Sequence, residues 1–567
     1  EAADESLAEV STGKLDPAAI PGASTPKSQV WIAKLPYNAQ VTPYLEVDSP
    51  AGLRIGIQMD DYEGGGANNV RAEYITREGR QEFECFGWMN GHEVRYTIPD
   101  AVRVLRLRYR ESGFATAPVG TFHCDDPFFN RLRAKAARTL YLTMRDTFMD
   151  CPDRERAQWW GDVVNELGEV FYAFDRRADT LTRKAILELV GWQKPDGVLF
   201  SPVPAGNWDR DLPLQMLASI GRQGFWTYAF YSGDFETLRA AYPGMKRYLE
   251  IWDLQPDGLI RPRPGSWPWG DWGENVDMTL LANIWYHLAL QGQLNTAKAL
   301  GYENDLPWIE ARLRSIERAF SPSFWTGNEF RSPHYKGATD DRANALAVVA
   351  GLAHRDQYSQ LRSVFLKEEH ASPYMEKYVL EALCLMGEPA LAQDRMKRRY
   401  KKMVDHPEYT TLWEGWRIGK EGFGGGTINH AWSGGPLTIM SQYFAGIAPT
   451  QPGFAAYHVY PQLGALREID ASVNTRQGTV EVSIRRNPRV LTLNLNSPDK
   501  TVANVGLPAG CDEQITRVQL NGEVVWEAGK IGAKIRGVRN LGFNGDQRLC
   551  FEVPAGQLLM LDRGITH

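Results

Sequence analysis

The first part of the chain alternates apolar and polar residues with period two, as half-buried β-strands do. The clearest stretch is VRVLRLRYRE, which runs from Val102 to Glu111. This alternation predicts an N-terminal β-sandwich domain over residues 28–118. The preceding residues 1–27 are rich in alanine, serine, proline and glycine, so we expect them to form a poorly ordered lead-in segment.

The pattern changes near Cys124, where apolar residues begin to recur at helical spacing. About twelve such stretches follow one another, joined by loops rich in glycine, proline and tryptophan and without strand patterns between them. Consecutive helices joined by long loops favour a closed ring of helical hairpins over a plain bundle. We therefore predict an (α/α)6 barrel over residues 119–450.

Strand-like alternation returns after the helical region, in the segments GTVEVSIRR and RVLTLNLNS. Turn signals separate these segments, which is typical of an antiparallel β-sandwich. We predict such a domain over residues 451–567. The expected fold class is therefore multidomain, with an (α/α)6 barrel flanked by an N-terminal β domain and a C-terminal β-sandwich.

Composition narrows the classes of function. Of the 567 residues, 43% are hydrophobic and 23% are charged, and the mean hydropathy is -0.39. Because no run of about 18 apolar residues occurs, we expect neither a membrane span nor a membrane partner. The net charge of -6 and the lack of a lysine/arginine block argue against nucleic acid as a partner.

Six cysteines are scattered along the chain without the CxxC spacing of zinc sites, so we expect no bound metal. Cys511 and Cys550 lie in the same C-terminal segment and could form a disulfide, with two free thiols as the alternative. The chain begins at Glu1 and shows no signal peptide, so it could be a mature or trimmed form. We expect a periplasmic or secreted location in preference to a cytoplasmic one. The oligomeric state is not indicated.

Tryptophan is the informative residue type. Of 18 tryptophans, 15 lie between Trp159 and Trp432. Most are expected to be core residues. However, the flat C–H faces of sugar rings stack on indoles, so this density also favours a carbohydrate-binding cleft in the helical region.

The densest group of charged and aromatic residues is MRDTFMDCPDRERAQWWGD, residues 144–162. One interpretation is a salt-bridged surface loop, with Asp162 as the N-cap of the next helix. Cys151 and the paired tryptophans weaken that interpretation, because a solvated loop has no need of them. Glu155 is a candidate general acid, since crowding by Asp150 and Asp162 next to indole rings favours its protonated form, whereas the adjacent arginines oppose this effect.

A second group lies much later, at YTTLWEGWRIGKEGFGGGTINHAWSGGP, residues 409–436. Glu414 stands between two tryptophans, and a glycine-rich turn precedes His430. Glycoside cleavage without a cofactor needs one protonated and one ionised carboxyl group. Glu414 could supply the second carboxyl only if the ring of helices closes. Otherwise Glu414 would be a residue at a helix end and His430 a structural histidine.

These motifs resemble the catalytic domain of glycoside hydrolase family 78, the α-L-rhamnosidases. The resemblance is carried by DCPDRERAQWWGD around Glu155 and by TLWEGW and the later Asn-His pair, and it covers the whole helical segment. It implies an inverting hydrolase that releases terminal α-L-rhamnose without a cofactor. It also implies that Glu155 is the general acid and Glu414 the general base.

The same resemblance implies a set of sugar-binding residues. They are Asp150, Arg154, Trp159, Asp162, Trp208, Trp272 and His430. Trp267 and Trp269 compete with Trp272 for its role in the pocket wall. The commoner family form has an additional aspartate between the positions of Arg154 and Glu155, so the spacing from Asp150 to the catalytic glutamate is one residue shorter here.

Two other interpretations stay open at this point. A different (α/α)6 carbohydrate enzyme, such as a uronyl hydrolase or a phosphorylase, would share the scaffold and the tryptophans. A non-catalytic glycan-binding protein would share the pocket but would not need an acid–base pair of carboxyl groups. If the chain is an enzyme of either kind, its expected partner is a glycoside, oligosaccharide or polysaccharide substrate. For the family 78 interpretation, that substrate contains rhamnose.

Overall fold

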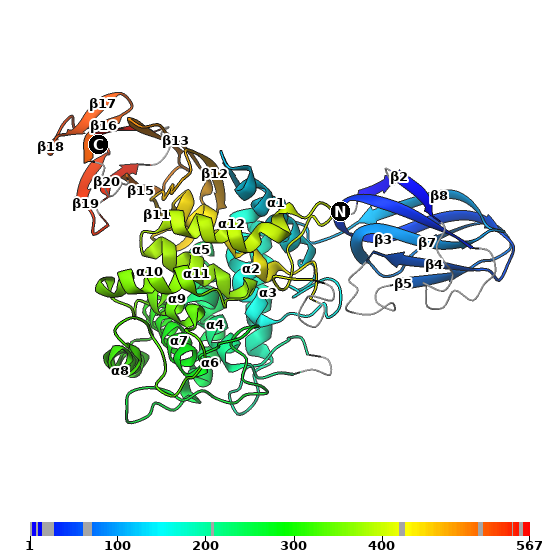
Figure 1. Ribbon diagram of the computed structural model, residues 1–567, viewed down its shortest axis with the longest axis horizontal. Coiled ribbons are helices and arrows are strands. Elements are labelled where there is room, and N and C mark those ends of the chain that lie inside the picture. The colour runs from blue at the N-terminus through cyan, green and yellow to red at the C-terminus, as the bar shows by residue number, and fades with distance from the viewer. Residues whose placement is uncertain are drawn as a thin grey trace. The chain divides into compact units, whose positions relative to one another are not determined.

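The computed structural model describes residues 3–6, 9–13, 28–60, 71–205, 209–418, 426–507, 514–546, 548–554 and 559–566. The chain divides into two compact units, whose elements are labelled in Figure 1. Unit 1 comprises residues 1–115, 138–157 and 402–431. Unit 2 comprises residues 116–137, 158–401 and 432–567.

Unit 1 contains an eight-stranded antiparallel sheet system. Its strands are β1 (Ala3–Ser6), β2 (Glu9–Gly13), β3 (Ser28–Ser49), β4 (Arg54–Met59), β5 (Arg71–Ile75), β6 (Gly79–Glu84), β7 (Met89–Pro99) and β8 (Arg103–Glu111). The first part of β3 pairs with β2 and β7, and its second part pairs with β6 and β8. The two shortest N-terminal strands, β1 and β2, fall within the segment expected to be poorly ordered.

An irregularity interrupts β3 where it changes partners. Its register with β7 shifts between Lys34 and Ala39. The intervening residues include Pro36, which has no N–H to give to a ladder. The shift also releases the N–H of Asn38, which donates to Thr410 Oγ1 at 3.0 Å instead. A β-bulge thus redirects this backbone group away from the sheet, toward the late loop of the same unit.

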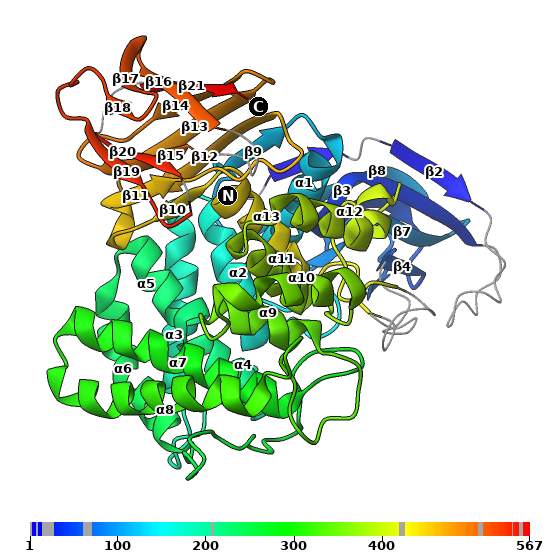
Figure 2. The ribbon, with the colours of Figure 1, turned by 60° about the vertical axis from the view of Figure 1, so that its left-hand side comes forward.

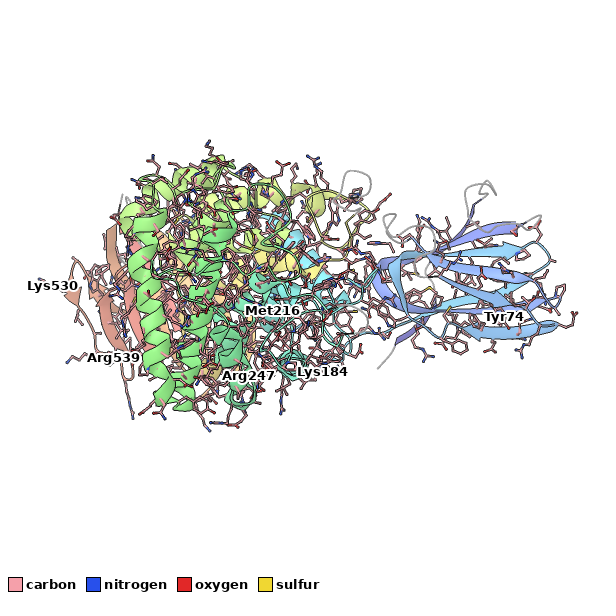
Figure 3. All side chains as sticks on the ribbon, turned by 90° about the horizontal axis from the view of Figure 1, so that it is seen from below. Tyr74, Lys184, Met216, Arg247, Lys530 and Arg539 are labelled. Carbon is pink, nitrogen blue, oxygen red and sulfur yellow. The ribbon has the colours of Figure 1, made fainter. Side chains whose placement is uncertain are left out.

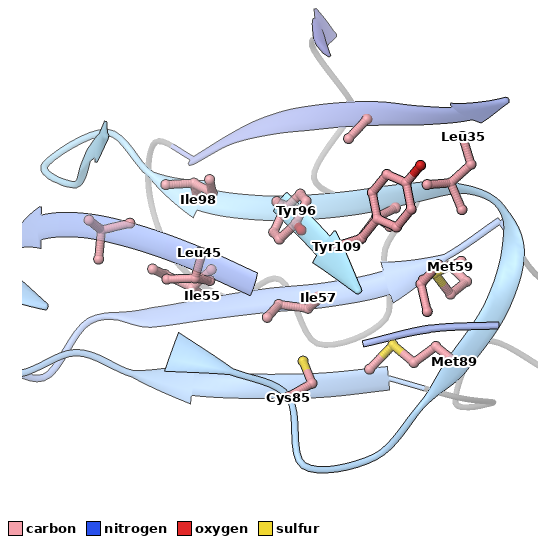
Figure 4. Close-up of a cluster of buried hydrophobic side chains, with 14 of the residues drawn as sticks. Leu35, Leu45, Ile55, Ile57, Met59, Cys85, Met89, Tyr96, Ile98 and Tyr109 are labelled. Atoms are coloured by element: carbon pink, nitrogen blue, oxygen red, sulfur yellow. The ribbon is translucent and has the colours of Figure 1, made fainter. Parts of the chain in front are cut away.

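The core of unit 1 lies between the faces of these strands. Figure 4 shows Leu45, Ile55, Ile57 and Tyr96 gathered there, and all four are fully buried. Ile55, Ile57 and Tyr96 are each flanked along their strands by more exposed residues, as the period-two pattern predicts. Burial of each such side chain stabilises the fold by about 1.5–3 kcal/mol.

Unit 2 carries most of the helices. They are α1 (Pro127–Leu142, which continues into unit 1), α2 (Trp160–Ala173), α3 (Asp179–Gly191), α4 (Pro213–Ile220), α5 (Thr227–Ser232), α6 (Phe235–Glu250), α7 (Met278–Leu300), α8 (Leu306–Phe324), α9 (Asp341–Val349), α10 (Tyr358–Lys367), α11 (Pro373–Leu385), α12 (Pro389–Asp405, which also continues into unit 1) and α13 (Gly435–Ile439). In the described residues from α1 to α13 no strand lies between the helices, which confirms the helical pattern predicted from the sequence.

The ends of several helices follow from local side-chain chemistry. Asp234, Asp277 and Asp340 each accept a hydrogen bond from a backbone N–H in the first turn of α6, α7 and α9. Such N-caps satisfy donors that have no partner within the helix. Gly301 ends α7 with a φ of 75°, a left-handed conformation that glycine adopts without strain.

Two sheets follow the helices in unit 2, and Figure 2 shows them as neighbouring layers. One sheet has the order β10-β11-β15-β20-β19, and the other has the order β18-β17-β16-β21-β14-β13-β12-β9. Their strands are β9 (Thr121–Cys124), β10 (Ile447–Pro449), β11 (Ala456–Val459), β12 (Glu468–Thr475), β13 (Gly478–Arg486), β14 (Val490–Asn496), β15 (Val502–Leu507), β16 (Gln514–Leu520), β17 (Glu523–Glu527), β18 (Lys530–Ile531), β19 (Arg539–Phe543), β20 (Leu549–Pro554) and β21 (Leu559–Thr566). Figure 3 labels Lys530 and Arg539 on these strands.

The start of the helical region is joined to the C-terminal strands. β9 precedes α1 in the sequence but pairs antiparallel with β12, and Phe122 lies opposite Ala471. The C-terminal strands therefore extend a sheet that begins before the first helix.

Two remaining expectations concern cysteine pairing and the membrane. Cys550 has a free thiol, and Cys511 lies outside the described residues. No helix in the described part of the chain is both long and apolar enough to span a bilayer.

Candidate active site

The loop that carries Glu155 lies in unit 1, between α1 and α2. The carboxylate of Glu155 forms an ion pair with its neighbour Arg154, and Arg154 Nη2 lies 3.0 Å from Glu155 Oε1. The Glu155 side chain is 28% exposed, so this carboxyl group is accessible to a ligand. We call residues 150–157 the acid loop.

A second loop of unit 1 carries Glu414, and we call residues 407–430 the base loop. Glu414 is fixed by Thr427, whose N–H donates to Glu414 Oε2 at 3.0 Å. The backbone N–H of Glu414 donates in turn to Thr427 O at 2.9 Å. Unlike Glu155, the Glu414 side chain is only 9% exposed. The base loop therefore holds one carboxylate in a single, mostly buried position.

Arg154 brings the two glutamates together. Its Nη2 lies 3.0 Å from Glu155 Oε1 and 3.9 Å from Glu414 Oε2. Because both distances meet at one nitrogen, these two oxygens are at most about 6.9 Å apart. The two carboxyl groups of inverting glycosidases are about 6.5–9.5 Å apart, and those of retaining glycosidases are about 5–5.5 Å apart. A separation of at most about 6.9 Å is compatible with the retaining spacing and with the shortest inverting spacings. The geometry thus supports a two-carboxylate site, and inversion remains a prediction.

Asp150 and His430 meet at the other side of the acid loop. Asp150 Oδ1 accepts from the N–H of Ala157 at 3.0 Å, which closes the loop. Cys151 Sγ donates to Asp150 Oδ2 at 3.1 Å. One ligand atom from each of Asp150, Cys151 and His430 lies within 4.8 Å of the others. The ring nitrogen Nδ1 of His430 bonds to Thr427 Oγ1 at 2.9 Å.

These three residue types could in principle hold a zinc ion. Complete burial, together with the neighbouring carboxylates of Asp150 and Asp153, raises the pKa of the Cys151 thiol well above its usual value. The thiol is therefore a neutral donor to Asp150. Asp150 and His430 are also the residues to which the resemblance gives sugar hydroxyls, and polar groups of this kind suit that use equally well.

A buried amide network connects the two loops, and it was not recognised in the sequence. Asn429 Nδ2 donates to both carboxylate oxygens of Asp153, at 3.2 and 3.1 Å. Asn90, on β7, donates to Asp153 Oδ1 as well. Asn38 Nδ2, from the bulge in β3, donates to Asn429 Oδ1 at 2.7 Å. Asp153 is therefore a support between the loops rather than a ligand for sugar.

Trp159 and Asp162 belong to unit 2, at the start of α2. The helix begins at Trp160, and Trp159 is its N-cap residue, without a side-chain cap. The alternative that Asp162 is the N-cap is therefore wrong, since Asp162 lies inside the first turn. It is 2% exposed, and a carboxylate at this end of a helix is stabilised by the helix dipole.

A cluster of aromatic rings in unit 2 contains one of the expected pocket tryptophans. We define the aromatic cluster as Trp269, Trp272, Tyr374 and Trp432. Trp269 contacts each of the other three, with ring centroids 5.7, 5.4 and 6.4 Å away in that order. Trp272 is half-buried whereas Trp269 is 5% exposed, so Trp272 is the better placed of the two to contact a ligand. Trp208 lies outside the described residues.

Carboxylates lie close to this cluster. Burial and the nearby charges of Asp162 and Asp271 raise the pKa of Tyr374. Asp271, next to Trp272, is fully buried and accepts from Ser372 N at 2.8 Å and from Arg342 Nη1 at 3.1 Å. Burial outweighs these partners and raises the pKa of Asp271 to about 6. Tyr374, Trp432 and Asp271 were not recognised in the sequence, because they come from separate segments.

Comparison with known proteins agrees with the fold and the motifs. The family model for the bacterial α-L-rhamnosidase six-hairpin glycosidase domain matches residues 117–444. The model for the bacterial α-L-rhamnosidase C-terminal domain matches residues 446–521. The chain is thus multidomain, with a six-hairpin glycosidase domain followed by a domain rich in β-strands.

Individual relatives give the same picture at low identity. An α-L-rhamnosidase of Alteromonas sp. (strain LOR) is 24% identical over 403 residues, which cover 64% of this chain and 42% of the relative. An α-L-rhamnosidase of Streptomyces avermitilis is 22% identical over 522 residues, which cover 86% of this chain and 49% of the relative. The chain therefore spans about half the length of these curated relatives.

Solved structures share the fold. The α-L-rhamnosidase from Dictyoglumus thermophilum superposes with a TM-score of 0.79 at 19% identity and covers 95% of this chain and 62% of its own. The Streptomyces avermitilis α-L-rhamnosidase complexed with L-rhamnose gives a TM-score of 0.75 at 19% identity, over 94% of this chain and 52% of its own.

Proposed function

Because the chain belongs to the bacterial α-L-rhamnosidase family, we propose that it is itself an inverting glycoside hydrolase that releases terminal non-reducing α-L-rhamnose. The family membership confirms the resemblance to glycoside hydrolase family 78. One observation carries the proposed activity, namely that Arg154 pairs with both Glu155 and Glu414. A site for binding alone needs no such pair of carboxyl groups.

The two glutamates have different surroundings, and each suits one role. Glu414 accepts a hydrogen bond from Thr427 N–H and lies near Arg154, and these two contacts hold its carboxylate in one position, as a general base that activates water requires. Glu155 is more exposed, which suits a residue that would donate a proton to the glycosidic oxygen of a bound substrate. Glu155 would donate its proton to the leaving oxygen while water, deprotonated by Glu414, attacks the anomeric carbon from the opposite face.

Arg154 has to change partner during this reaction. Its ion pair with Glu155 favours the carboxylate form, whereas a general acid must start protonated. The family resemblance assigns Arg154 to the hydroxyls of rhamnose. Binding of the sugar would then draw the guanidinium away from Glu155 and leave that carboxyl group free to hold a proton.

Other residues would bind and orient the sugar. The family resemblance assigns the rhamnose hydroxyls to Asp150, Asp162 and His430, and indoles such as Trp159, Trp208 and Trp272 would cover the apolar face of the ring. We also expect the helices to close into an (α/α)6 barrel flanked by β-sandwiches, which the six-hairpin family model supports. A periplasmic or secreted location remains part of the proposal.

A substrate panel tests the activity. The chain should hydrolyse p-nitrophenyl α-L-rhamnoside and leave the corresponding α-glucoside and uronides intact. Cleavage of a uronide, or phosphate-dependent cleavage, would identify another (α/α)6 enzyme instead. NMR of the first-formed product should show β-L-rhamnose, since single displacement inverts the α-configuration. Rhamnose binding without hydrolysis would favour the glycan-binding interpretation.

A further inference from the structure

A groove of about 760 Å³ lies within unit 1, next to the base loop. One wall is formed by the β3 bulge, residues 34–37, and by His92 on β7. The other is formed by residues 407–410 and by Ile428 of the base loop. Its volume is in the range of small-molecule binding sites in proteins.

The base-loop wall is continuous with the catalytic base. Residues 407–410 lead directly into Glu414, and Ile428 follows Thr427, the residue that fixes the Glu414 carboxylate. An occupant of the groove would therefore lie along the two backbone segments that position the base. This is where a part of the substrate beyond the cleaved sugar can be held.

The wall is held rigidly by hydrogen bonds inside unit 1. Thr410 N–H donates to His92 Nε2 at 3.1 Å, and Asn38 N–H donates to Thr410 Oγ1 at 3.0 Å. Asp60 accepts from the backbone N–H of His92 at 2.7 Å. A preformed surface loses little entropy when it binds a ligand, which favours recognition over simple surface adhesion.

Tyr37 gives the groove an aromatic platform. The residue is 37% exposed, and the guanidinium of Arg138 lies over its ring at 4.1 Å from the centroid. Its hydroxyl donates to Glu111 at 3.0 Å, so the ring is fixed at both the face and the edge. A fixed, partly exposed phenol ring is suited to stack on the C–H face of a sugar.

The charges in the groove favour an uncharged ligand. Its lining contains two cationic side chains, Lys34 and Arg95, and three carboxylates, Asp60, Glu93 and Glu408. Arg95 is paired with Glu93 at 2.7 Å, so the balance is close to neutral. A polyanionic sugar chain would meet more carboxylates than cations and would gain little electrostatic attraction.

We propose that this groove binds the uncharged sugar residues to which the terminal rhamnose is attached, with Tyr37 as the stacking platform. This inference rests on the proposed rhamnosidase activity. It implies that the chain prefers neutral, rhamnose-capped oligosaccharides over small aryl rhamnosides, because only the former reach the groove.

The test compares substrates that differ in length. Tyr37→Ala should lower kcat/KM for a neutral rhamnose-capped oligosaccharide by roughly 2- to 10-fold, the scale of one aromatic contact, and leave that for p-nitrophenyl α-L-rhamnoside unchanged. Tyr37→Phe, which retains the ring, should keep most of the preference. Phe86→Ala removes a fully exposed aromatic residue of the same unit that does not line the groove, and it should change neither substrate.

Other outcomes would overturn the inference. An equal loss on both substrates would give Tyr37 a role in stability instead, and a preference for uronate-containing oligosaccharides would contradict the uncharged ligand. Saturation-transfer NMR with the neutral oligosaccharide provides a readout independent of catalysis. If the wild type binds the oligosaccharide but cleaves no rhamnoside, the proposed activity is wrong, whereas oligosaccharide binding in the groove is retained. If Tyr37→Ala binds the oligosaccharide as the wild type does, the proposed binding in the groove is wrong, and the proposed rhamnosidase activity is unaffected.

Discussion

Asn429 binds the carboxylate of Asp153 through both oxygens, with Nδ2 at 3.2 Å from Oδ1 and 3.1 Å from Oδ2. Asp153 lies two residues before the proposed acid, and Asn429 lies next to His430. This contact therefore links the acid loop to the base loop within unit 1. The two glutamates come from segments about 260 residues apart, and their spacing depends on links of this kind.

Removal of this link should cost both stability and activity. Asp153→Ala leaves the buried amides of Asn90 and Asn429 without their acceptor, which should lower the free energy of unfolding by about 1–3 kcal/mol. It should also lower kcat at temperatures where the variant is fully folded. Asp48→Ala, at a partly exposed ion pair with Arg103, is the control and should change stability by less than about 1 kcal/mol. Wild-type kcat in folded Asp153→Ala would contradict the linking role.

The acid and the base should respond differently to the leaving group. Glu155→Gln removes the proton donor, so we expect a loss of about 10²–10⁴-fold in kcat on alkyl rhamnosides and a smaller loss on p-nitrophenyl rhamnoside, whose leaving group needs little protonation. Glu414→Gln should lose activity about equally on both. Glu84→Gln, at a surface ion pair with Arg110, serves as the control. Equal leaving-group dependence in the two variants would reverse or abolish these assignments.

The sequence predicted the features that arise from local patterns. Helical periodicity and strand alternation located most elements, although α2 begins at Trp160, so that Asp162 lies in its first turn and is not its N-cap. Glu155 and Glu414 were predicted as acid and base from the residues that gather around each of them along the chain and from the family resemblance, and these roles stay predictions. Asn38 was not found, because its role depends on a bulge that only the pairing of β3 reveals. The contact between Arg342 and Asp271 joins residues 71 positions apart, and no local pattern marks it.

Two buried arginines in unit 2 offer a matched comparison for the role of the tryptophan-rich loop. Arg342 pairs with Asp271 and Asp340 and also donates to the carbonyls of Glu274 and Asn275, so it fixes the loop that carries Trp272. Arg395 is equally buried and pairs with Asp341 and Glu376. The arrangement predicts that Arg342 positions Trp272, whereas Arg395 only stabilises the fold.

Lysine substitutions separate these roles. Arg342→Lys and Arg395→Lys should each lower the free energy of unfolding by about 1–3 kcal/mol, since lysine cannot make the same set of hydrogen bonds. Only Arg342→Lys should also raise KM for p-nitrophenyl rhamnoside, by about fivefold, with a smaller change in kcat and a shift in tryptophan fluorescence. A similar rise in KM in both variants would assign the effect to general loosening of unit 2.

The buried carboxyl of Asp271 should make stability depend on pH. Its pKa of about 6 in the folded protein lies above the ordinary value of 3.8, because burial disfavours the charged form. Its stabilising contribution is therefore fully present below about pH 4 and is lost as the pH rises through 6, by up to about 3 kcal/mol. Asp271→Asn cannot titrate at this position. The unfolding free energy of the wild type should therefore fall relative to that of the variant from pH 4 to pH 7. Urea titrations at both pH values measure this change. A difference that stays constant, or one that favours the wild type at pH 7, would mean that the Arg342 ion pair outweighs burial and that Asp271 is ionised throughout.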